Sequence, residues 1–306
     1  MKRAFLFLLG ALSLSFTACH PDDNTNNEPK VKFKFRFDPQ QARLNNLGLP
    51  ATMPAGHAAQ SPNFRLLGVH YIEFAQSALT MLGAGSVLYH APETTAGGAN
   101  AIDFNQEVLA PADSVFLEIP ISQINPGTYT WVRASVGYQN YDIRFNVKNI
   151  PVIGNLDNQS GTISSFLGFN TYIQDYRIRS QSITVNDDRT QGYWGFEPNL
   201  TAPYNSYYSQ TSSGQAPAGA TTVVNPIANT SPIPAGSCVV TGQFTQPLVI
   251  TGTETSDITV TLSFSTNQSF EWIDSNSNGQ LDFYADGSAA EAIVDMGVRG
   301  LEVEAQ

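Results

Sequence analysis

One eight-residue run constrains the fold of this 306-residue chain more than any other feature. Residues 31–38 (VKFKFRFD) alternate apolar and charged side chains without interruption. Successive side chains of a β-strand point to opposite faces, so this run predicts a strand with one face toward a core and the other in water. Runs rich in β-branched and aromatic residues predict further strands at 64–74, 114–119, 128–136, 141–147, 162–166, 237–244, 248–251 and 258–264.

Helical patterns are almost missing from the sequence, with at most a turn or two expected at 291–296. Many short strands with frequent turns predict an all-β protein of one or two antiparallel β-sandwich domains with long loops and little helix. A change in charge and a connecting segment near residue 150 give candidate domains at 31–150 and 151–306, with a single large domain as the alternative. The second candidate domain contains a long polar loop at 204–237 and an acidic C-terminal part.

The first eighteen residues have the pattern of a secretory signal peptide. Lys2 and Arg3 precede an uncharged stretch, and small residues lead to Cys19. The segment resembles the lipobox of bacterial lipoproteins, which implies that Cys19 becomes the acylated residue, palmitate being a typical acyl group, and that residues 19–30 form a flexible tether. Asp22 and Asp23 resemble the acidic signal that routes some lipoproteins to the cell surface, although a solvated linker is the alternative. The implied location is the outer membrane, with the periplasmic and the exterior face both open.

Charge and motifs limit the function. The net charge is −11, which makes nucleic acid an unsuitable partner, because binding it requires many Lys and Arg residues at the phosphates. Cys238 lies in an apolar run and is expected to be a buried hydrophobic residue, with a reactive thiol as the alternative. The sequence has no nucleophile elbow, phosphate-binding loop or dinucleotide glycine pattern. These observations favour a binding or structural protein over an enzyme.

The strongest chemical motif is the run DSNSNGQLD at 274–282. Calcium takes six to eight oxygen ligands, and Gly279 stands where such a loop turns sharply. The spacing predicts a calcium site formed by Asp274, Asn276, Asn278, Gln280 and Asp282, with Asp286, Glu291 or Asp295 completing the shell. The run resembles the calcium loops of EF-hands, dockerins and thrombospondin-type repeats, but Ala285 replaces the bidentate glutamate of an EF-hand and a strand-like segment precedes it. A polar β-turn is the alternative interpretation.

Six aromatic residues gather among turn-forming residues and could build a binding surface. They are Tyr193, Trp194, Phe196, Tyr204, Tyr207 and Tyr208. Flat rings can stack on sugar faces, so a surface glycan-binding module is one hypothesis. The other is that these rings fix a long loop onto a sandwich.

Histidines and methionines offer a second, softer ligand set. The stretch from His70 through His90 to the turn at 126–129 is similar in strand layout to MbnP-like periplasmic copper-binding lipoproteins. The resemblance implies an envelope copper-binding protein, for which His57, His70, His90, Met53 and Met81 are available.

The sequence thus predicts a lipid-anchored cell-envelope protein with a non-catalytic binding or structural role, stabilised by Ca²⁺ at 274–282. A glycan-binding module and a copper-binding protein are the alternatives. Expected partners are the membrane, through the lipid on Cys19, and a glycan or another envelope protein.

Overall fold

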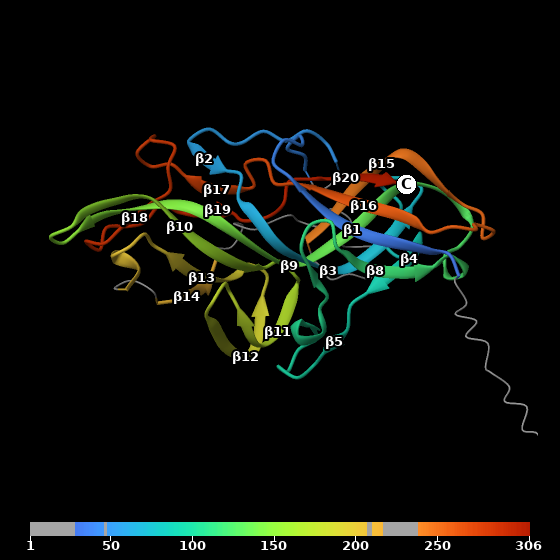
Figure 1. Ribbon diagram of the computed structural model, residues 1–306, viewed down its shortest axis with the longest axis horizontal. Coiled ribbons are helices and arrows are strands. Elements are labelled where there is room, and N and C mark those ends of the chain that lie inside the picture. Colours follow the sequence, from blue (N-terminus) through green and yellow to red (C-terminus); the bar gives the residue numbers. More distant parts are fainter. Residues whose placement is uncertain (1–27, 46–47, 207–209, 217–237) are drawn as a thin grey trace, which may run out of the picture.

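The computed structural model describes residues 28–45, 48–206, 210–216 and 238–306 (Figure 1). The strands are β1 (Lys30–Asp38), β2 (His57–Gln60), β3 (Asn63–Ala75), β4 (Ser86–His90), β5 (Glu93–Thr94), β6 (Ala101–Asp103), β7 (Leu109–Ala110), β8 (Val115–Pro120), β9 (Gly127–Ile150), β10 (Gly154–Phe166), β11 (Asn170–Arg177), β12 (Ser182–Thr190), β13 (Tyr193–Asn199), β14 (Ser212–Gln215), β15 (Cys238–Ile250), β16 (Ile258–Ser265), β17 (Phe270–Ile273), β18 (Asp282–Tyr284), β19 (Ile293–Asp295) and β20 (Leu301–Ala305).

In the part of the chain that the structure describes, helical structure is limited to three short 3-10 turns, η1 (Phe104–Gln106), η2 (Ile121–Gln123) and η3 (Tyr204–Ser206). The predicted all-β, sandwich-like class is therefore confirmed. Within the described ranges, no helix has the length and apolar character needed to cross a membrane.

Strand β1 shows how the alternating run specifies the fold. Val31, Phe33 and Phe35 are fully buried, while the intervening basic side chains point outward. The outward face forms ion pairs, of which Lys32 Nζ to Asp257 Oδ2 (2.6 Å) is one. β1 pairs in parallel with β16 and antiparallel with β8, so its apolar face becomes part of a larger core surface.

Strand β9, with 24 residues, is the longest element and runs through the length of the molecule (Figure 1). Along one edge its first half pairs with β15 and its second half with β10, while β3 pairs with residues 131–142. The change from β15 to β10 occurs at Gly137, whose carbonyl accepts the N–H groups of Leu167 (2.7 Å) and Gly168 (3.1 Å). The sequence predicted two strands here, because the intervening polar residues have the composition of a loop. Asn140 is nevertheless buried and donates to Ser164 Oγ (3.0 Å) and to the Ile178 carbonyl (2.9 Å).

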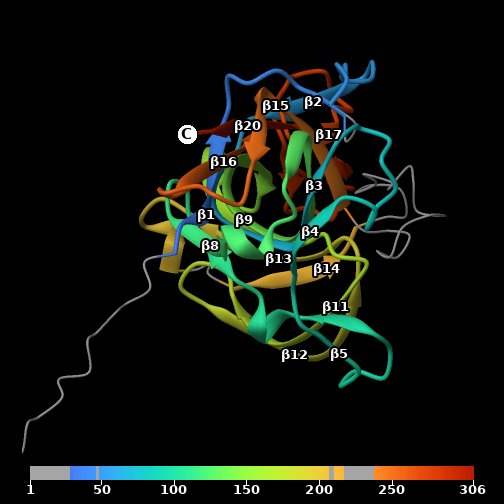
Figure 2. The ribbon, with the colours of Figure 1, turned by 90° about the vertical axis from the view of Figure 1, so that its right-hand side faces the viewer.

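The main sheet follows the order β14-β13-β10-β9-β15-β20-β16-β1-β8, with β3 on the other edge of β9. It curls so that β1 faces β3 across a core, and the ring centroids of Phe33 and Phe74 lie 5.8 Å apart. Figure 2 shows this curl from the end of the molecule. A second apolar cluster lies between the other half of β9, β10 and the C-terminal strands, so β9 contributes to both.

The segment expected to connect two domains is the turn between β9 and β10. Ile150 and Gly154 pair across it, and Val152 at its tip is fully exposed. Two smaller sheets, β12-β11-β6-β5 and β19-β17-β2, lie beside the main sheet. Cys238 opens β15 with its side chain buried, as expected, and burial raises the pKa of its thiol to about 12.

Candidate metal centre

Two histidines and a glutamate converge near the outer edge of β3. His70 on β3, His90 at the end of β4 and Glu93 at the start of β5 each offer a ligand atom, and these atoms all lie within 4.8 Å of one another. Glu93 Oε1 is 2.9 Å from His70 Nε2 and 3.2 Å from His90 Nε2. Among the described residues this is the one group of three or more His, Cys, Asp or Glu side chains close enough to share an ion.

Strand pairing explains why residues twenty positions apart meet. β3 and β4 form an antiparallel pair in which Tyr71 is opposite His90, and the Ala91 N–H donates to the His70 carbonyl (2.7 Å). Pro92 then turns the chain so that Glu93 folds back toward both imidazoles. The site therefore depends on the register of one hairpin.

The connection between β3 and β4 is fixed by a buried charge. Glu73 accepts the backbone N–H of Gly83 (3.1 Å) and Gly85 (2.6 Å), and the Arg133 guanidinium lies 3.8 Å from the same carboxylate. Both charged side chains are fully buried. Gly85 is required here, because a Cβ would lie 2.1 Å from the Phe74 carbonyl oxygen. These contacts hold the hairpin, and with it His90, in one place.

The environment keeps His70 in the form that binds metals. Its side chain is fully buried, and burial together with the neighbouring His90 lowers its pKa to about 4. The imidazole is consequently neutral at physiological pH, and a neutral imidazole has the lone pair that a metal ligand needs. The Phe169 ring, whose centroid is 5.8 Å from that of His70, lies close to the imidazole.

The other two side chains are open to solvent. His90 is 51% exposed and Glu93 is 23% exposed, so an ion can reach the site from outside. Asn100 Nδ2 donates to Glu93 Oε2 (2.7 Å), which leaves Oε1 directed at the histidines. Supporting hydrogen bonds of this kind orient the carboxylates of metal sites.

Two imidazoles and one carboxylate form a set that suits first-row transition metals. Imidazole binds copper, zinc, iron and nickel well, whereas calcium and magnesium prefer oxygen alone. Three protein ligands leave at least one coordination position for water or a second molecule.

The structure brings together only part of the histidine and methionine set. His57 lies elsewhere, with its Nδ1 2.5 Å from Glu271 Oε1. Met81 is exposed in the connection between β3 and β4, and Met53 precedes β2. Sequence reasoning did not identify Glu93 as a ligand. Its position three residues after His90 is a signal of a shared site, but a comparison of histidine spacings alone does not include it.

The loop at 274–282 is closed by hydrogen bonds. Asp274 accepts the N–H groups of Asn278 (3.1 Å) and Gly279 (2.9 Å), and the positive φ of Gly279 (71°) permits the turn. Asn276 and Asn278 both direct their amide groups at Asp282 Oδ2, each at 2.8 Å. The backbone turns at Gly279, the position at which the spacing of the motif predicts a sharp turn.

Residues outside the loop complete this arrangement. Gln280 and Asp282 both accept from Asn146 Nδ2, at 2.6 and 2.7 Å. Glu291 spans the loop by accepting the backbone N–H of Ser275 (3.0 Å) and of Asp282 (3.0 Å). Asp286 forms its hydrogen bonds outside the loop; its carboxylate accepts them from Asn149 Nδ2 (2.7 Å) and from the N–H of Ser288.

The aromatic set divides between two sides of β13. Tyr193 is buried in a cluster with Phe166 and Tyr176, while Trp194 and Phe196 belong to the second cluster, where Tyr204 also packs. Tyr207 and Tyr208 lie outside the described residues, as does Cys19.

A buried carboxyl group is a further feature that sequence patterns did not indicate. Glu107 is buried, and neither of its oxygens has a hydrogen-bond partner among the described residues. The carboxyl occupies space left by Gly68 and Gly137, where an added Cβ would lie 2.5 and 2.2 Å from Oε1. Burial raises its pKa to about 8.

Comparisons with known proteins return no match. No protein-family model matches the chain, and it has no significant match among curated proteins or among solved structures. The functional argument therefore depends on the geometry described above.

Proposed function

We propose that this protein binds a first-row transition-metal ion, copper(II) or zinc(II), through His70, His90 and Glu93. The observation that carries the proposal is the convergence of the three ligand atoms within 4.8 Å. The neutral state of the buried His70 and the access given by the exposed His90 support it. The role is binding rather than catalysis, in line with the absence of catalytic motifs from the sequence.

Of these two ions, copper(II) should bind to the site with the higher affinity. Affinities of nitrogen and oxygen sites rise along the first row to copper and fall again at zinc. A site with two imidazoles, a carboxylate and an open position suits either ion. The availability of each metal then decides which one is bound.

The proposed setting is the cell envelope. We place the chain at the outer membrane through a lipid on Cys19, with residues 19–30 as the tether, because the first nineteen residues have the signal and lipobox pattern. Growth with labelled palmitate tests this placement. Label should enter the full chain and should be absent from a Cys19→Ala variant, and equal labelling of both would contradict it.

Isothermal titration of the full chain with Cu²⁺ and then Zn²⁺ tests the metal site. We expect one ion per chain for the high-affinity event. His90→Ala should weaken this event by more than the roughly 10–100-fold that loss of a supporting residue costs, because it removes a ligand directly. Asn100→Ala should fall within that range, since Asn100 only orients Glu93.

His57→Ala is the matched control, because His57 contacts Glu271 and not the site. It should leave the high-affinity event unchanged. If His57→Ala and His90→Ala weaken binding equally, the ion is bound elsewhere and the proposal fails.

A second candidate role is structural calcium binding at 274–282. It is favoured by the turn at Gly279 and by side-chain oxygens of Asp274, Asn276 and Asn278 that all accept backbone N–H groups of the loop. At millimolar extracellular calcium, even weak binding stabilises the folded state by mass action. Calcium should therefore raise the melting temperature of the full chain, and Asp274→Ala should abolish the rise. An unchanged rise in the variant would place the ion elsewhere.

A further inference from the structure

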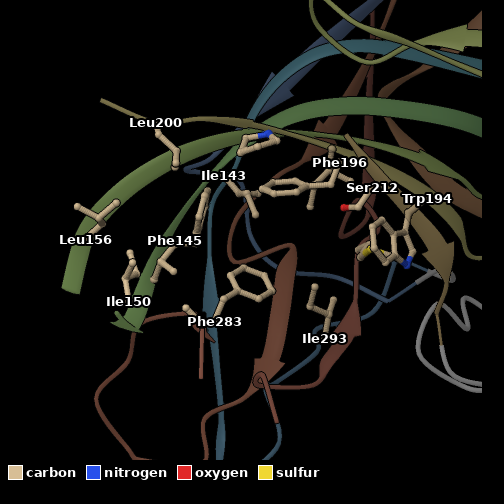
Figure 3. A pocket seen from close by; sticks show the side chains of 15 residues that line it. Ile143, Phe145, Ile150, Leu156, Trp194, Phe196, Leu200, Ser212, Phe283 and Ile293 are labelled. Carbon is tan, nitrogen blue, oxygen red and sulfur yellow. The ribbon is translucent and has the colours of Figure 1, made fainter. Parts of the chain in front are cut away.

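An apolar cavity lies at the C-terminal end of β9, whereas His70 of the metal centre lies beside the middle of that strand. The lining of the cavity includes Ile143 and Phe145 of β9, Trp194 and Phe196 of β13, and Phe283 of β18, a strand that pairs with β9 (Figure 3). The cavity volume is about 370 Å³. Protein interiors are close-packed and contain few voids larger than a water molecule, so a space of this size is not a packing defect.

The chemistry of the lining excludes polar ligands. The walls are hydrocarbon and aromatic, and Ser212 carries the one hydroxyl group among the described lining residues. A bound water needs two to four polar partners, and a sugar needs more, so neither finds its hydrogen bonds inside. Cavities lined by leucine, isoleucine and phenylalanine bind apolar molecules; a 150 Å³ example binds benzene. The present cavity has more than twice that volume.

The shape of the cavity is set by strands. The lining residues of β9 occupy alternate positions from Ile143 to Val147, and the lining continues to Ile150 near the hairpin tip. The seven residue-to-residue steps from Ile143 to Ile150 span about 23 Å in an extended chain. Figure 3 shows Leu156 and Ile150 on one side, and Trp194 and Ser212 on the other. This elongated form suits a single chain better than a compact ring compound.

The end of the cavity at Ser212 reaches solvent. Ser212 is exposed on β14, opposite Phe196 in the strand pair. A ligand can therefore keep a polar group in water at this mouth while its hydrocarbon part enters. The Ser212 hydroxyl can donate a hydrogen bond to an oxygen of that polar group.

We propose that this cavity binds one long acyl chain, such as that of a hexadecanoic acid molecule, with its polar end at Ser212. The hydrocarbon tail lies along β9, beside the contacting rings of Phe145 and Phe283, and ends toward Ile150. The site is separate from the metal centre and does not depend on it.

Chain length provides the first test. The full chain is titrated with octanoic, decanoic and hexadecanoic acids while displacement of a fluorescent fatty acid is followed. Each methylene buried contributes about fourfold in affinity, so decanoic acid should bind roughly fifteenfold more tightly than octanoic acid. A single-chain lysophosphatidylcholine with a hexadecanoyl group should compete with hexadecanoic acid, because the tail is what the cavity holds. Affinity that is independent of chain length, or lack of saturable binding, overturns the proposal.

A variant locates the ligand. Ala285 lines the cavity at the Ile150 end, where its N–H donates to the Lys148 carbonyl (2.9 Å). Ala285→Trp places an indole in the space of the end of the tail and should weaken hexadecanoic acid binding by at least about fifteenfold, the equivalent of two lost methylenes. Val249→Trp is the matched control, because Val249 is exposed on β15 and does not line the cavity. Equal affinities in both variants would overturn the proposal.

Fluorescence gives a readout that does not depend on the stability of the Ala285 variant. A brominated hexadecanoic acid should quench Trp194, which lines the cavity, and Trp194→Phe should remove most of that quenching. Quenching that is unchanged in Trp194→Phe would mean that the acid binds outside the cavity.

Discussion

Glu107 gives the most quantitative prediction for stability. Its carboxyl group is buried against Gly68 and Gly137, without a hydrogen-bond partner among the described residues, and burial raises its pKa from 4.5 to about 8. The folded state therefore keeps the proton over a pH range in which the unfolded chain has released it. Because the folded state binds more protons in this range, its stability must fall as the pH rises.

The magnitude follows from the pKa difference. Each pKa unit corresponds to about 1.4 kcal/mol, so the full effect is about 5 kcal/mol. The stabilising effect is complete below pH 4.5 and is lost as the pH rises toward 8. Between pH 5 and pH 8 the free energy of unfolding should fall by roughly 3 to 4 kcal/mol on account of this group.

Urea unfolding at pH 5 and pH 8 measures this effect. Other groups titrate in the same range, so the informative quantity is the difference between the native chain and Glu107→Gln, whose side chain has a similar shape and does not titrate. The variant should lose the Glu107 part of the pH dependence. An identical pH dependence in the two proteins would show that Glu107 is solvated or hydrogen-bonded, and would refute the argument.

Three further predictions concern packing and hydrogen bonding. Phe35→Ala removes a fully buried ring whose centroid lies 4.0 Å from that of Phe116, and should lower the free energy of unfolding in urea by about 3–5 kcal/mol. Gly137→Ala forces a methyl group against Glu107 and should cost about 1–3 kcal/mol in the same assay, whereas Gly127→Ala, whose added Cβ would make only ordinary contacts from 3.7 Å, should spare the contacts of Glu107. Glu197→Ala removes the carboxylate that accepts hydrogen bonds from the backbone N–H groups of Arg179, Ser180 and Gln181, so their hydrogen exchange should accelerate; unchanged exchange would mean that the β11–β12 turn does not need this carboxylate.

Part of the fold was predictable because it is local. The alternating run at 31–38 fixes β1 and its buried face, and the predicted run at 258–264 matches β16 closely. The 24 residues of β9 were not predictable as one strand, because Gln139 and Asn140 become strand residues only through burial and long-range hydrogen bonds. Polar composition alone does not distinguish such residues from a loop.

The candidate sites also differ in whether they depend on local sequence or on long-range pairing. The turn at Gly279 depends on spacing within one loop, so the sequence indicates it directly. The meeting of His70 with His90 depends on the register of β3 and β4, which the sequence does not specify on its own. The apolar cavity depends on how far Ile293 of β19 lies from the lining residues of β9, a distance that no residue pattern encodes.

The central claim is that the two histidines and Glu93 hold a metal ion, and electron paramagnetic resonance of the full chain with one equivalent of Cu²⁺ tests it most directly. We expect nitrogen hyperfine structure from two imidazoles, reduced to one in His90→Ala and unchanged in His57→Ala. A copper spectrum that is the same in the native chain and in His90→Ala would contradict the account.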